Sequence, residues 1–386
     1  MLQFLRTPLL LVVLLSFFGG FLPAQKKKKP GDEDGYIPVV ITDTKKKKDE
    51  DITQSLPPPK DLPNVVVAET ERLTYSVSSL LPKGLLSAQT REILKGMVRS
   101  SRGNIVKLRA FVAGSGDLRR IGEIVGEAFT EKHLNLPVLS VVQVGGLPME
   151  GAQVVIETTE LDKRSVNSNG VAFISGQSAS SVSESLEKIK RALRGGGMEP
   201  DDALRVTCFV SSLEDQRNIR QAMASSFPNA ALNYVQMQRE PVTPAVECEA
   251  VARIRVASSP AMRFLNPPDL DKSPYYTQAA LVTSPKLVIT GTQLAFGSQD
   301  ADFKLAFDRL QRAMASSNAR LDHVVMSHQY MTSRSIIDRL RAVRANYFST
   351  ANPPASTLLP FEGLPSLDAS FGIDVIAVPD STAAQR

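Results

Sequence analysis

Few residues of this chain could do acid–base, nucleophilic or metal chemistry. Its only histidines are His133, His323 and His328. His323 and His328 are five residues apart in a predicted strand, so their side chains should point to opposite faces, which opposes a shared metal site. Asp322 and His323 lie near Ser327, but neighbouring strand residues diverge and no nucleophile elbow is present. We therefore expect neither catalysis by these histidines nor a bound metal.

Two cysteines, Cys208 and Cys248, both fall in predicted strands. An exported protein could pair them in a disulfide. The favoured interpretation is that they are two small buried hydrophobic side chains. No Cys or Cys/His spacing suggests a metal site.

The first 24 residues are typical of a secretory signal peptide. Arg6 supplies a positive charge, Leu9–Leu22 is apolar, and Leu22-Pro23-Ala24 is an acceptable cleavage site. The apolar run is short for a membrane span, although an uncleaved N-terminal anchor is the alternative. We expect a secreted or periplasmic protein without membrane attachment after cleavage.

Residues 25–64 are predicted to be a disordered linker. Two blocks of four lysines alternate with acidic residues and are followed by Pro57-Pro58-Pro59. Such a segment buries too little apolar surface to order itself, so we interpret it as a solvated spacer. A tether to anionic lipid or cell-wall polymer is the alternative, because lysine blocks are attracted to negative surfaces.

The net charge of +5 is concentrated in the tail. Residues 1–60 hold ten Lys or Arg and seven acidic residues, a net charge of +3, and the other 326 residues carry +2. The predicted folded part is nearly neutral and lacks the basic footprint of a nucleic-acid-binding protein.

One strand–helix unit occurs three times. The three units register on Phe129, Phe227 and Phe348. They comprise Ile105–Ala113 with Asp117–Phe129, Leu204–Ser211 with Asp215–Phe227, and Asp322–Met331 with Ser333–Phe348. An Asp or Ser side chain near each helix start could accept hydrogen bonds from the free backbone N–H groups of the first turn. Repetition at this scale predicts three similar domains.

Further elements surround each unit. Before each unit we expect a short strand followed by a helix. In the three repeats, in order, this strand ends in Leu86-Ser87-Ala88-Gln89, Ile174-Ser175-Gly176-Gln177 and Ile289–Gln293. Val182, Leu186, Ile189 and Leu193 show the helical period, and the glycines after Arg194 should end that helix. Two strands follow each unit, so the order per repeat is strand, helix, strand, helix, strand, strand.

These features resemble the reactive intermediate deaminase (Rid, YjgF-type) family. The resemblance rests on the strand ending in Ser175-Gly176-Gln177 and on the closing strand segment Val246–Ala252. Val142–Pro148 is similar to the family's V-x-V-x-x-L-P segment, and the third repeat keeps Leu364-Pro365 and Ile373–Ala377.

The resemblance implies an α/β (α+β) fold of three tandem Rid or chorismate-mutase-like domains, each a mixed sheet covered by two helices. Because family members are homotrimers with ligand sites between subunits, three domains in one chain would form an intramolecular pseudo-trimer and a monomer in solution. The expected domains are 65–160, 165–257 and 274–379, with 258–273 as a linker.

The family's activity is hydrolysis of enamines and imines, with an arginine that holds the substrate carboxylate bidentately. Alignment places Leu139, Leu232 and Ser356 where that arginine stands. The acidic residue on the last strand is kept as Glu247 in the second repeat, where the other repeats have Val155 and Gly372.

The following acidic position holds Glu157, Glu249 and Asp374. Arg239 and Arg253 are near enough in sequence to replace the missing arginine, although solvated strand-end charges are the simpler interpretation.

We therefore expect a small-molecule-binding or scaffold protein that has lost the family's deamination and that uses no cofactor. The alternative is an enamine or imine deaminase, or a related hydrolase, with a rearranged site between repeats. In that case Glu247 would orient water and Ser175, Gly176 and Gln177 would line the pocket. Small metabolites are the expected partners. Ribonuclease action is disfavoured by the near-neutral charge.

Overall fold

The computed structural model describes residues 60–114, 116–239, 245–257 and 259–380. The predicted signal peptide, residues 1–24, and the predicted linker up to residue 59 lie outside the described residues. Within the described ranges, no helix has the length and apolar character needed to cross a bilayer.

The first sheet has four strands in the order β2-β5-β3-β4. Its elements are β2 (Leu73–Val77), α1 (Leu86–Ser100), β3 (Gly103–Ala113), α2 (Arg119–Glu131), β4 (Val138–Val144) and β5 (Val154–Asp162). Residues Leu86, Ile93 and Met97 recur at helical spacing on α1 and pack with Ile121 and Val125 of α2 into the core above this sheet.

The second sheet has the order β10-β11-β6-β9-β7-β8. Its own segment supplies β6 (Val171–Ala179), α3 (Val182–Gly195), β7 (Ala203–Val210), α4 (Gln216–Ser226), β8 (Ala231–Gln236) and β9 (Val246–Arg253). Two further strands come from later in the chain, β10 (Met262–Leu265) and β11 (Ala279–Val282). The expected linker 258–273 thus contains β10, and β11 pairs antiparallel with β6.

The third sheet has the order β1-β12-β16-β14-β15, with β13 also on β16. It contains β12 (Lys286–Thr290), β13 (Gln293–Phe296), α5 (Asp300–Ala315), β14 (Val324–Met331), α6 (Ile337–Arg344), β15 (Ala355–Pro360) and β16 (Ala369–Ala377). Its edge strand β1 (Val65–Glu69) comes from the start of the described chain and pairs antiparallel with β12.

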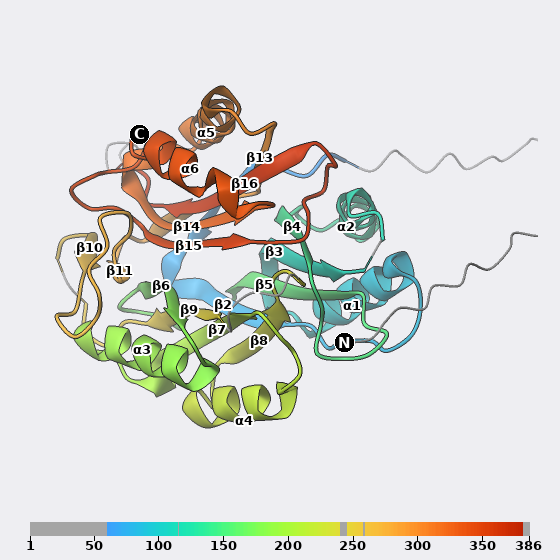
Figure 1. The fold of residues 1–386 in the computed structure, drawn as a ribbon, viewed down its shortest axis with the longest axis horizontal. Coiled ribbons are helices and arrows are strands. Elements are labelled where there is room, and N and C mark those ends of the chain that lie inside the picture. Colours follow the sequence, from blue (N-terminus) through green and yellow to red (C-terminus); the bar gives the residue numbers. More distant parts are fainter. Residues whose placement is uncertain (1–59, 115, 240–244, 258, 381–386) are drawn as a thin grey trace, which may run out of the picture. The chain divides into compact units, whose positions relative to one another are not determined.

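All three sheets share one strand pairing. β3, β7 and β14 each run parallel to the strand that follows, β4, β8 or β15, and antiparallel to β5, β9 or β16. Each sheet carries two helices, which lie on the outer sides of the strands in Figure 1. The α+β character is confirmed. The predicted element order is found in the first two repeats, whereas the third has an additional strand, β13, before its first helix.

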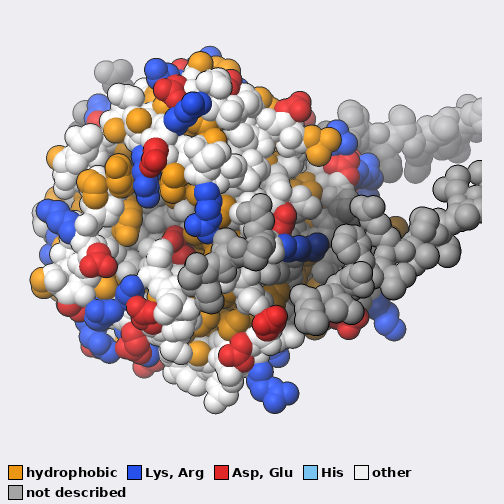
Figure 2. Space-filling view, in the orientation of Figure 1, with side chains coloured by type: hydrophobic (Ala, Val, Ile, Leu, Met, Phe, Trp, Pro, Cys, Tyr) orange, Lys and Arg blue, Asp and Glu red, His pale blue; other side chains and the backbone are white. Residues whose placement is uncertain are grey.

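The sheet faces away from the helices pack against one another. One buried cluster joins Val106 of β3, Phe173 of β6 and Val325 of β14, so it draws on all three sheets. A second joins Phe111, Phe209 and Tyr330, with Phe209 edge-on to Phe111. Phe111, Phe209 and Tyr330 occupy the same place in the three predicted repeats. Acidic and basic side chains are interspersed on the molecular face drawn in Figure 2.

Several expectations were wrong. Leu86–Gln89 does not close a strand but opens α1, because the buried residues Leu86, Ile93 and Met97 follow helical spacing. The side chain of Gln89 donates to the carbonyls of Gly84 and Gly151. The strand of that repeat is β2. His323 lies in a 3₁₀ turn, Leu321–His323, and pairs with Asp380, rather than lying in a strand with His328.

The two cysteines were favoured as unpaired hydrophobic residues, and this was wrong. Cys208 of β7 lies directly opposite Cys248 of β9, and the two form a disulfide. The register of the two strands brings the sulfurs together, which could not be deduced before the pairing of these strands was known.

The helix boundaries follow local sequence signals in part. Asp117 accepts the backbone N–H of Arg119, and Ser333 accepts that of Ser335. Asp215 makes no capping hydrogen bond. The glycines after Arg194 end α3 as predicted, with Gly197 at a φ of +76° that favours glycine.

Candidate functional site

Glu247 and the Ser175-Gly176-Gln177 turn meet on neighbouring strands. Gln177 and Ser178 of β6 lie opposite Cys248 and Glu247 of β9, and the register shifts between Ile174 and Gln177. The hydroxyl of Ser178 donates to Glu247 Oε2 over 2.5 Å. A side chain at Gly176 would collide with the carboxylate of Glu247, so glycine permits the close approach of this turn.

Ser175 is buried and connects this turn to two other segments. Its hydroxyl donates to the carbonyl of Thr277 over 2.5 Å and accepts the backbone N–H of Ser356 over 2.8 Å. The amide of Gln177 donates to Gln278 Oε1 over 2.6 Å. The turn that was predicted to line a pocket is thus occupied by hydrogen bonds within the protein.

The environment of Glu247 makes its carboxyl group easy to protonate at neutral pH. Burial raises its pKa to about 7 and the charge of Glu249 acts in the same direction, while the Ser178 hydrogen bond opposes them. Burial, together with the nearby charge of Glu247, raises the pKa of the Tyr276 phenol. A carboxyl group with a pKa near 7 is suited to general acid–base chemistry.

The three positions predicted to lack the family's arginine occupy equivalent places. Leu139 lies opposite Leu108, Leu232 opposite Val206, and Ser356 opposite Ser327, in the three parallel strand pairs. At two of them the backbone bonds a neighbouring sheet. The carbonyl of Leu139 accepts the N–H of Thr292 over 3.1 Å, and Ser356 donates to Ser175.

Neither candidate replacement arginine lies with Glu247. The Arg239 backbone N–H donates to Glu362, and its Nε donates to the carbonyl of Gly145 over 2.5 Å. Arg253 lies opposite Val171 at the far end of β9. Among the described residues, no arginine contributes to the pKa shift of Glu247.

Where the three sheets meet, a buried cluster of charges surrounds Glu157, Glu249 and Asp374. Arg109 donates two hydrogen bonds to Glu157, at 2.9 and 2.6 Å, and one to Glu249 at 2.7 Å. Lys107 pairs with Asp374 across two sheets. Three acidic residues from three sheets thus share cations.

Further side chains complete this cluster. The imidazole of His328 lies between two carboxylates, with Nδ1 2.9 Å from Asp374 and Nε2 3.3 Å from Glu249. Arg205 lies 3.2 Å from Glu249, and Thr357 donates to Glu249 over 2.5 Å. Three acids therefore face three Lys or Arg cations and one histidine.

The cluster's electrostatics favour its ionised form. Burial alone would raise the pKa of Glu249, but the charges of Arg109, His328 and Arg205 outweigh it and hold that pKa well below its usual range. Burial would likewise raise the pKa of Asp374, but the charges of Lys107 and His328 outweigh it and lower that pKa. Ionised carboxylates with near-balanced cations form a structural cluster rather than an open anion site.

Sequence reasoning named the three acids but missed their partners. Lys107 and Arg109 stand at alternate positions of an otherwise apolar strand, on the same face as Phe111. Arg205 stands at the equivalent place in β7, opposite Val251. Charged residues at alternating buried positions were the available signal.

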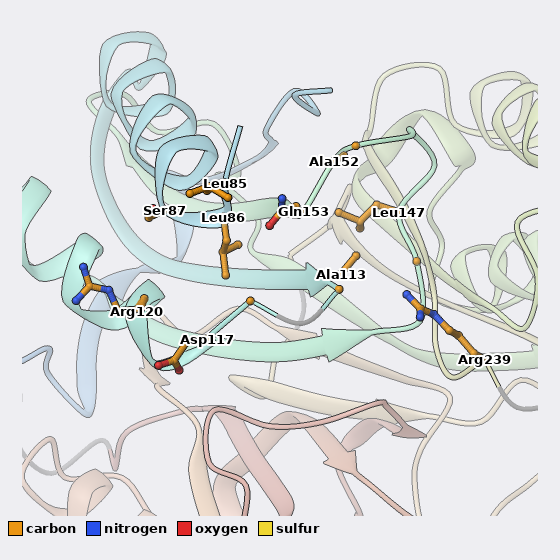
Figure 3. A pocket seen from close by; sticks show the side chains of 14 residues that line it. Leu85, Leu86, Ser87, Ala113, Asp117, Arg120, Leu147, Ala152, Gln153 and Arg239 are labelled. Atoms are coloured by element: carbon orange, nitrogen blue, oxygen red, sulfur yellow. The ribbon is translucent and has the colours of Figure 1, made fainter. Parts of the chain in front are cut away.

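A separate cavity of about 680 Å³ lies beside the first sheet. Leu86, Leu147, Ala113 and Ala152 contribute apolar surface to it. In Figure 3 the guanidinium of Arg239 extends toward Ala113, whereas that of Arg120 points away. Within the described residues, Arg239 donates hydrogen bonds through its backbone N–H and Nε, and none is found for its two Nη groups. The cavity thus combines apolar walls with the charged side chains of Arg239, Arg120 and Asp117. Asp117 is already paired with Arg119.

The cavity also receives the start of α1. Leu85, Leu86 and Ser87 line it, and the first turn of α1 has no side-chain cap. Free N–H groups at a helix start favour anions. Together with Arg239 they make the cavity complementary to a small organic anion.

Comparison with known proteins finds one segment that is similar to a described family. Residues 273–379 match the family model of Endoribonuclease L-PSP. No curated protein sequence matches the chain.

Three solved structures are similar to parts of this chain, and the descriptions of two of them name the YjgF or Rid family. A YjgF-family protein from Neisseria meningitidis is 16% identical over 31% of this chain and 96% of its own, with a TM-score of 0.24. The Rid-family protein YyfB from Yersinia pestis is 18% identical over 31% and 98%, with a TM-score of 0.28. Yeast Mmf1 is 19% identical over 31% and 99%, with a TM-score of 0.23. The predicted Rid resemblance is supported for residues 273–379, which carry the family match.

Proposed function

We propose that this protein is an exported Rid-like pseudo-trimer that binds small carboxylate-bearing molecules and does not deaminate them in the family's way. Its domains are 65–160, 165–257 and 274–379. The signal-like residues 1–24 support secretion or a periplasmic location. The shared strand pairing of the three sheets supports the three-domain organisation.

One observation carries the loss of the family's chemistry. Leu139, Leu232 and Ser356 share a register, and none of them supplies a cation. The guanidinium of Arg109 is held instead by Glu157 and Glu249. A substrate carboxylate has no partner at the family's position, and moving a buried guanidinium would leave two acids unpaired.

The cavity beside α1 supports binding. A carboxylate could take the two Nη groups of Arg239 as a fork, while Leu86 and Leu147 contact the apolar part of the ligand. A 2-oxo acid of four or five carbons has the required combination of one carboxylate and a short apolar tail.

Calorimetric titration with 2-oxobutanoate tests this proposal. We expect saturable binding that weakens at least ten-fold in Arg239→Gln, because the charged fork is lost. Arg253→Gln is the matched control and should bind as the unaltered protein does. Equal affinity in all three proteins would remove the cavity from consideration.

A second candidate function is hydrolysis of an enamine or imine at Glu247. The observation that favours it is the pKa of about 7, combined with the Ser178 and Tyr276 side chains nearby. A protonated Glu247 could donate to a leaving amine, and the carboxylate could then take a proton from water.

Ammonia release from an imino acid generated in situ separates the two functions. Binding without catalysis predicts a rate equal to background for the unaltered protein, Glu247→Gln and Glu247→Ala. A rate above background that both substitutions abolish would establish the hydrolase and refute our first proposal.

A further inference from the structure

Two of the three sheets are lengthened at the same edge by a strand from another part of the chain. β11 pairs antiparallel with β6 in the second sheet, and β1 pairs antiparallel with β12 in the third. β2 is the equivalent strand of the first sheet, because β2, β6 and β12 each pair with the last strand of their repeat. Among the described residues no strand lies beyond β2, which therefore presents a free edge.

The backbone of β2 offers hydrogen-bonding groups at this edge. Ser78 donates its N–H to Ile156 of β5, whereas the carbonyl of Leu73 accepts the side chain of Asn167 on the side away from β5. Alternate residues of a strand direct their backbone groups to the same side. The N–H and carbonyl of Tyr75 therefore point away from β5, and within the described residues no hydrogen bond is found for either group.

A groove of about 590 Å³ lies beside this edge. Thr74, Tyr75 and Ser76 line one side of it, and Leu204 of the second sheet lines the other. Tyr75 and Leu204 both pack against the buried cluster that joins the three sheets, whereas Ser76 bonds Glu160 on the opposite face of the first sheet. A strand in the groove would direct one side chain toward Tyr75 and Leu204, and its neighbours toward Thr74 and Ser76.

The groove carries a positive charge at its Thr74 end. Arg102 lines it and follows Ser101, whose hydroxyl lies 2.9 Å from Glu160, the residue opposite Thr74. In the part of the chain that the structure describes, no ion pair or hydrogen bond is found for the Arg102 side chain. Glu160 is the one acidic residue lining the groove, and it is already bonded by Ser76 and Ser101. The Thr74 end is thus complementary to a carboxylate.

We propose that this groove binds an extended segment of a partner protein, which adds to β2 as an antiparallel strand. The segment carries a β-branched apolar residue opposite Tyr75 and an acidic residue opposite Thr74. Its backbone exchanges two hydrogen bonds with Tyr75, and its carboxylate pairs with Arg102. β11 and β1 are precedents within this chain for antiparallel addition at the same edge.

The charges of the groove favour an acidic peptide over a second copy of this chain. A second copy pairing through its own β2 would bring threonine, tyrosine and serine to the groove but no carboxylate for Arg102. Arg253 is a further cation in the lining. The groove shares no lining residue with the cavity beside α1, so binding at one site does not depend on binding at the other.

Fluorescence polarisation of the full chain with fluorescein-labelled Val-Thr-Val-Asp-Val-amide tests the groove. In antiparallel pairing the central valine lies opposite Tyr75 and the aspartate opposite Thr74. We expect saturable binding that weakens by about three-fold or more in Arg102→Gln, because a partly exposed ion pair is lost. Arg119→Gln is the matched control, since Arg119 is exposed and lies outside the groove, and should bind as the unaltered protein does. Equal affinity in all three proteins, or no binding to any, would overturn the proposal.

Changes in the peptide backbone test strand addition itself. N-methylation of the central valine removes the N–H that would bond the Tyr75 carbonyl and leaves every side chain in place. Affinity should fall by about ten-fold or more, because a buried acceptor is left unpaired. N-methylation of the aspartate is the control, since its N–H points away from β2, and should leave the affinity within about two-fold. Equal affinities of the two methylated peptides would refute antiparallel addition.

Amide hydrogen exchange locates the bound peptide. A saturating concentration should slow exchange at the Tyr75 N–H by about ten-fold or more, because this group gains an acceptor. The N–H of Ser76 already faces β5 and should change less. Protection elsewhere with no change at Tyr75 would assign the peptide to another surface and overturn the proposal. A dimer of the unbound protein that the peptide dissociates would also overturn it, by assigning the edge to a second copy.

Discussion

At the scale of single residues, buried charges determine what this protein can do. Arg109 is 2% exposed and binds both Glu157 and Glu249, which are each 1% exposed. An arginine so held is unavailable to a substrate. The absence of the family's arginine from Leu139, Leu232 and Ser356 is therefore not compensated by the nearest buried guanidinium.

The first prediction concerns this guanidinium. Arg109→Met should lower the free energy of unfolding by about 3–5 kcal/mol, because two buried carboxylates would lose a cation while the methionine keeps most of the volume. Denaturant unfolding followed by circular dichroism measures the change. Arg119→Met is the control, since its ion pair with Asp117 is exposed, and should unfold as the unaltered protein does. A similar stability for both variants would show that the cluster contributes little.

A second prediction follows from Glu247. Its folded-state pKa, about 7, lies above the ordinary 4.5, so the folded state retains a proton that the unfolded state releases between these values. Stability should therefore fall as pH rises from about 4.5 to 7. Glu247→Gln cannot titrate and should be more stable than the unaltered protein at pH 8, by about 2 kcal/mol after allowing for partial exposure, and equal to it at pH 4.

Unfolding titrations at several pH values measure this difference. Glu184→Gln is the matched control, because hydrogen bonds with Ser180 lower the pKa of Glu184 and the sign should reverse. If Glu247→Gln follows the pH profile of the unaltered protein, Glu247 titrates normally and the argument for acid–base chemistry fails.

At the scale of elements, sequence patterns predicted strands and helices better than their partners. The hydrophobic periodicity and the alignment of the repeats on Phe129, Phe227 and Phe348 were sufficient to predict the three strand–helix units. Leu86–Gln89 was wrongly predicted to end a strand because its sequence resembles that of Ile174–Gln177. The spacing of its apolar residues is instead that of a helix. β1 and β11 do not join the sheets of the strands that follow them in the chain. No local sequence pattern predicts this, because each pairs with a strand that is distant in sequence.

The third prediction concerns β1. Gly291 bonds the carbonyl of Asn64, and Thr70 bonds that of Pro285, so even-numbered residues of β1 direct their backbone toward β12. Val66→Pro should remove a ladder hydrogen bond and destabilise the third sheet by about 2–3 kcal/mol. Hydrogen exchange at Ile289 should report it.

Val67→Pro is the control for this prediction. Val67 is 44% exposed and its N–H lies on the outer side of an edge strand, where proline is tolerated. Equal effects of the two substitutions at Ile289 would contradict the pairing of β1 with β12.

At the scale of the whole molecule, the proposed pseudo-trimer makes a prediction about size. If each domain's inner face is already covered by the other two, no further copy is needed. Light scattering should give the mass of one chain, 41.9 kDa including the first 24 residues, at all micromolar concentrations. A stable trimer of chains would contradict the intramolecular arrangement.

The last prediction concerns cooperativity, and it rests on how the three sheets share charges. Glu249 of the second sheet accepts hydrogen bonds from Arg109 of the first and Thr357 of the third. Lys107 of the first pairs with Asp374 of the third. If one sheet unfolded alone, charges in the other two would remain buried without partners, which costs several kcal/mol.

Partial unfolding is therefore disfavoured, and calorimetry should show one transition whose van't Hoff and calorimetric enthalpies agree. By the same reasoning, residues 165–257 expressed alone should not fold, because Glu249 would lose Arg109 and Thr357 while the face carrying Phe173 and Val251 would be exposed to water. Resolved transitions, or a folded isolated segment, would mean that each domain is stable by itself and that the central charges are dispensable. Replacing Glu249 by Gln should then leave the number of transitions unchanged, whereas shared charges predict that it separates the transition of the second sheet from the other two.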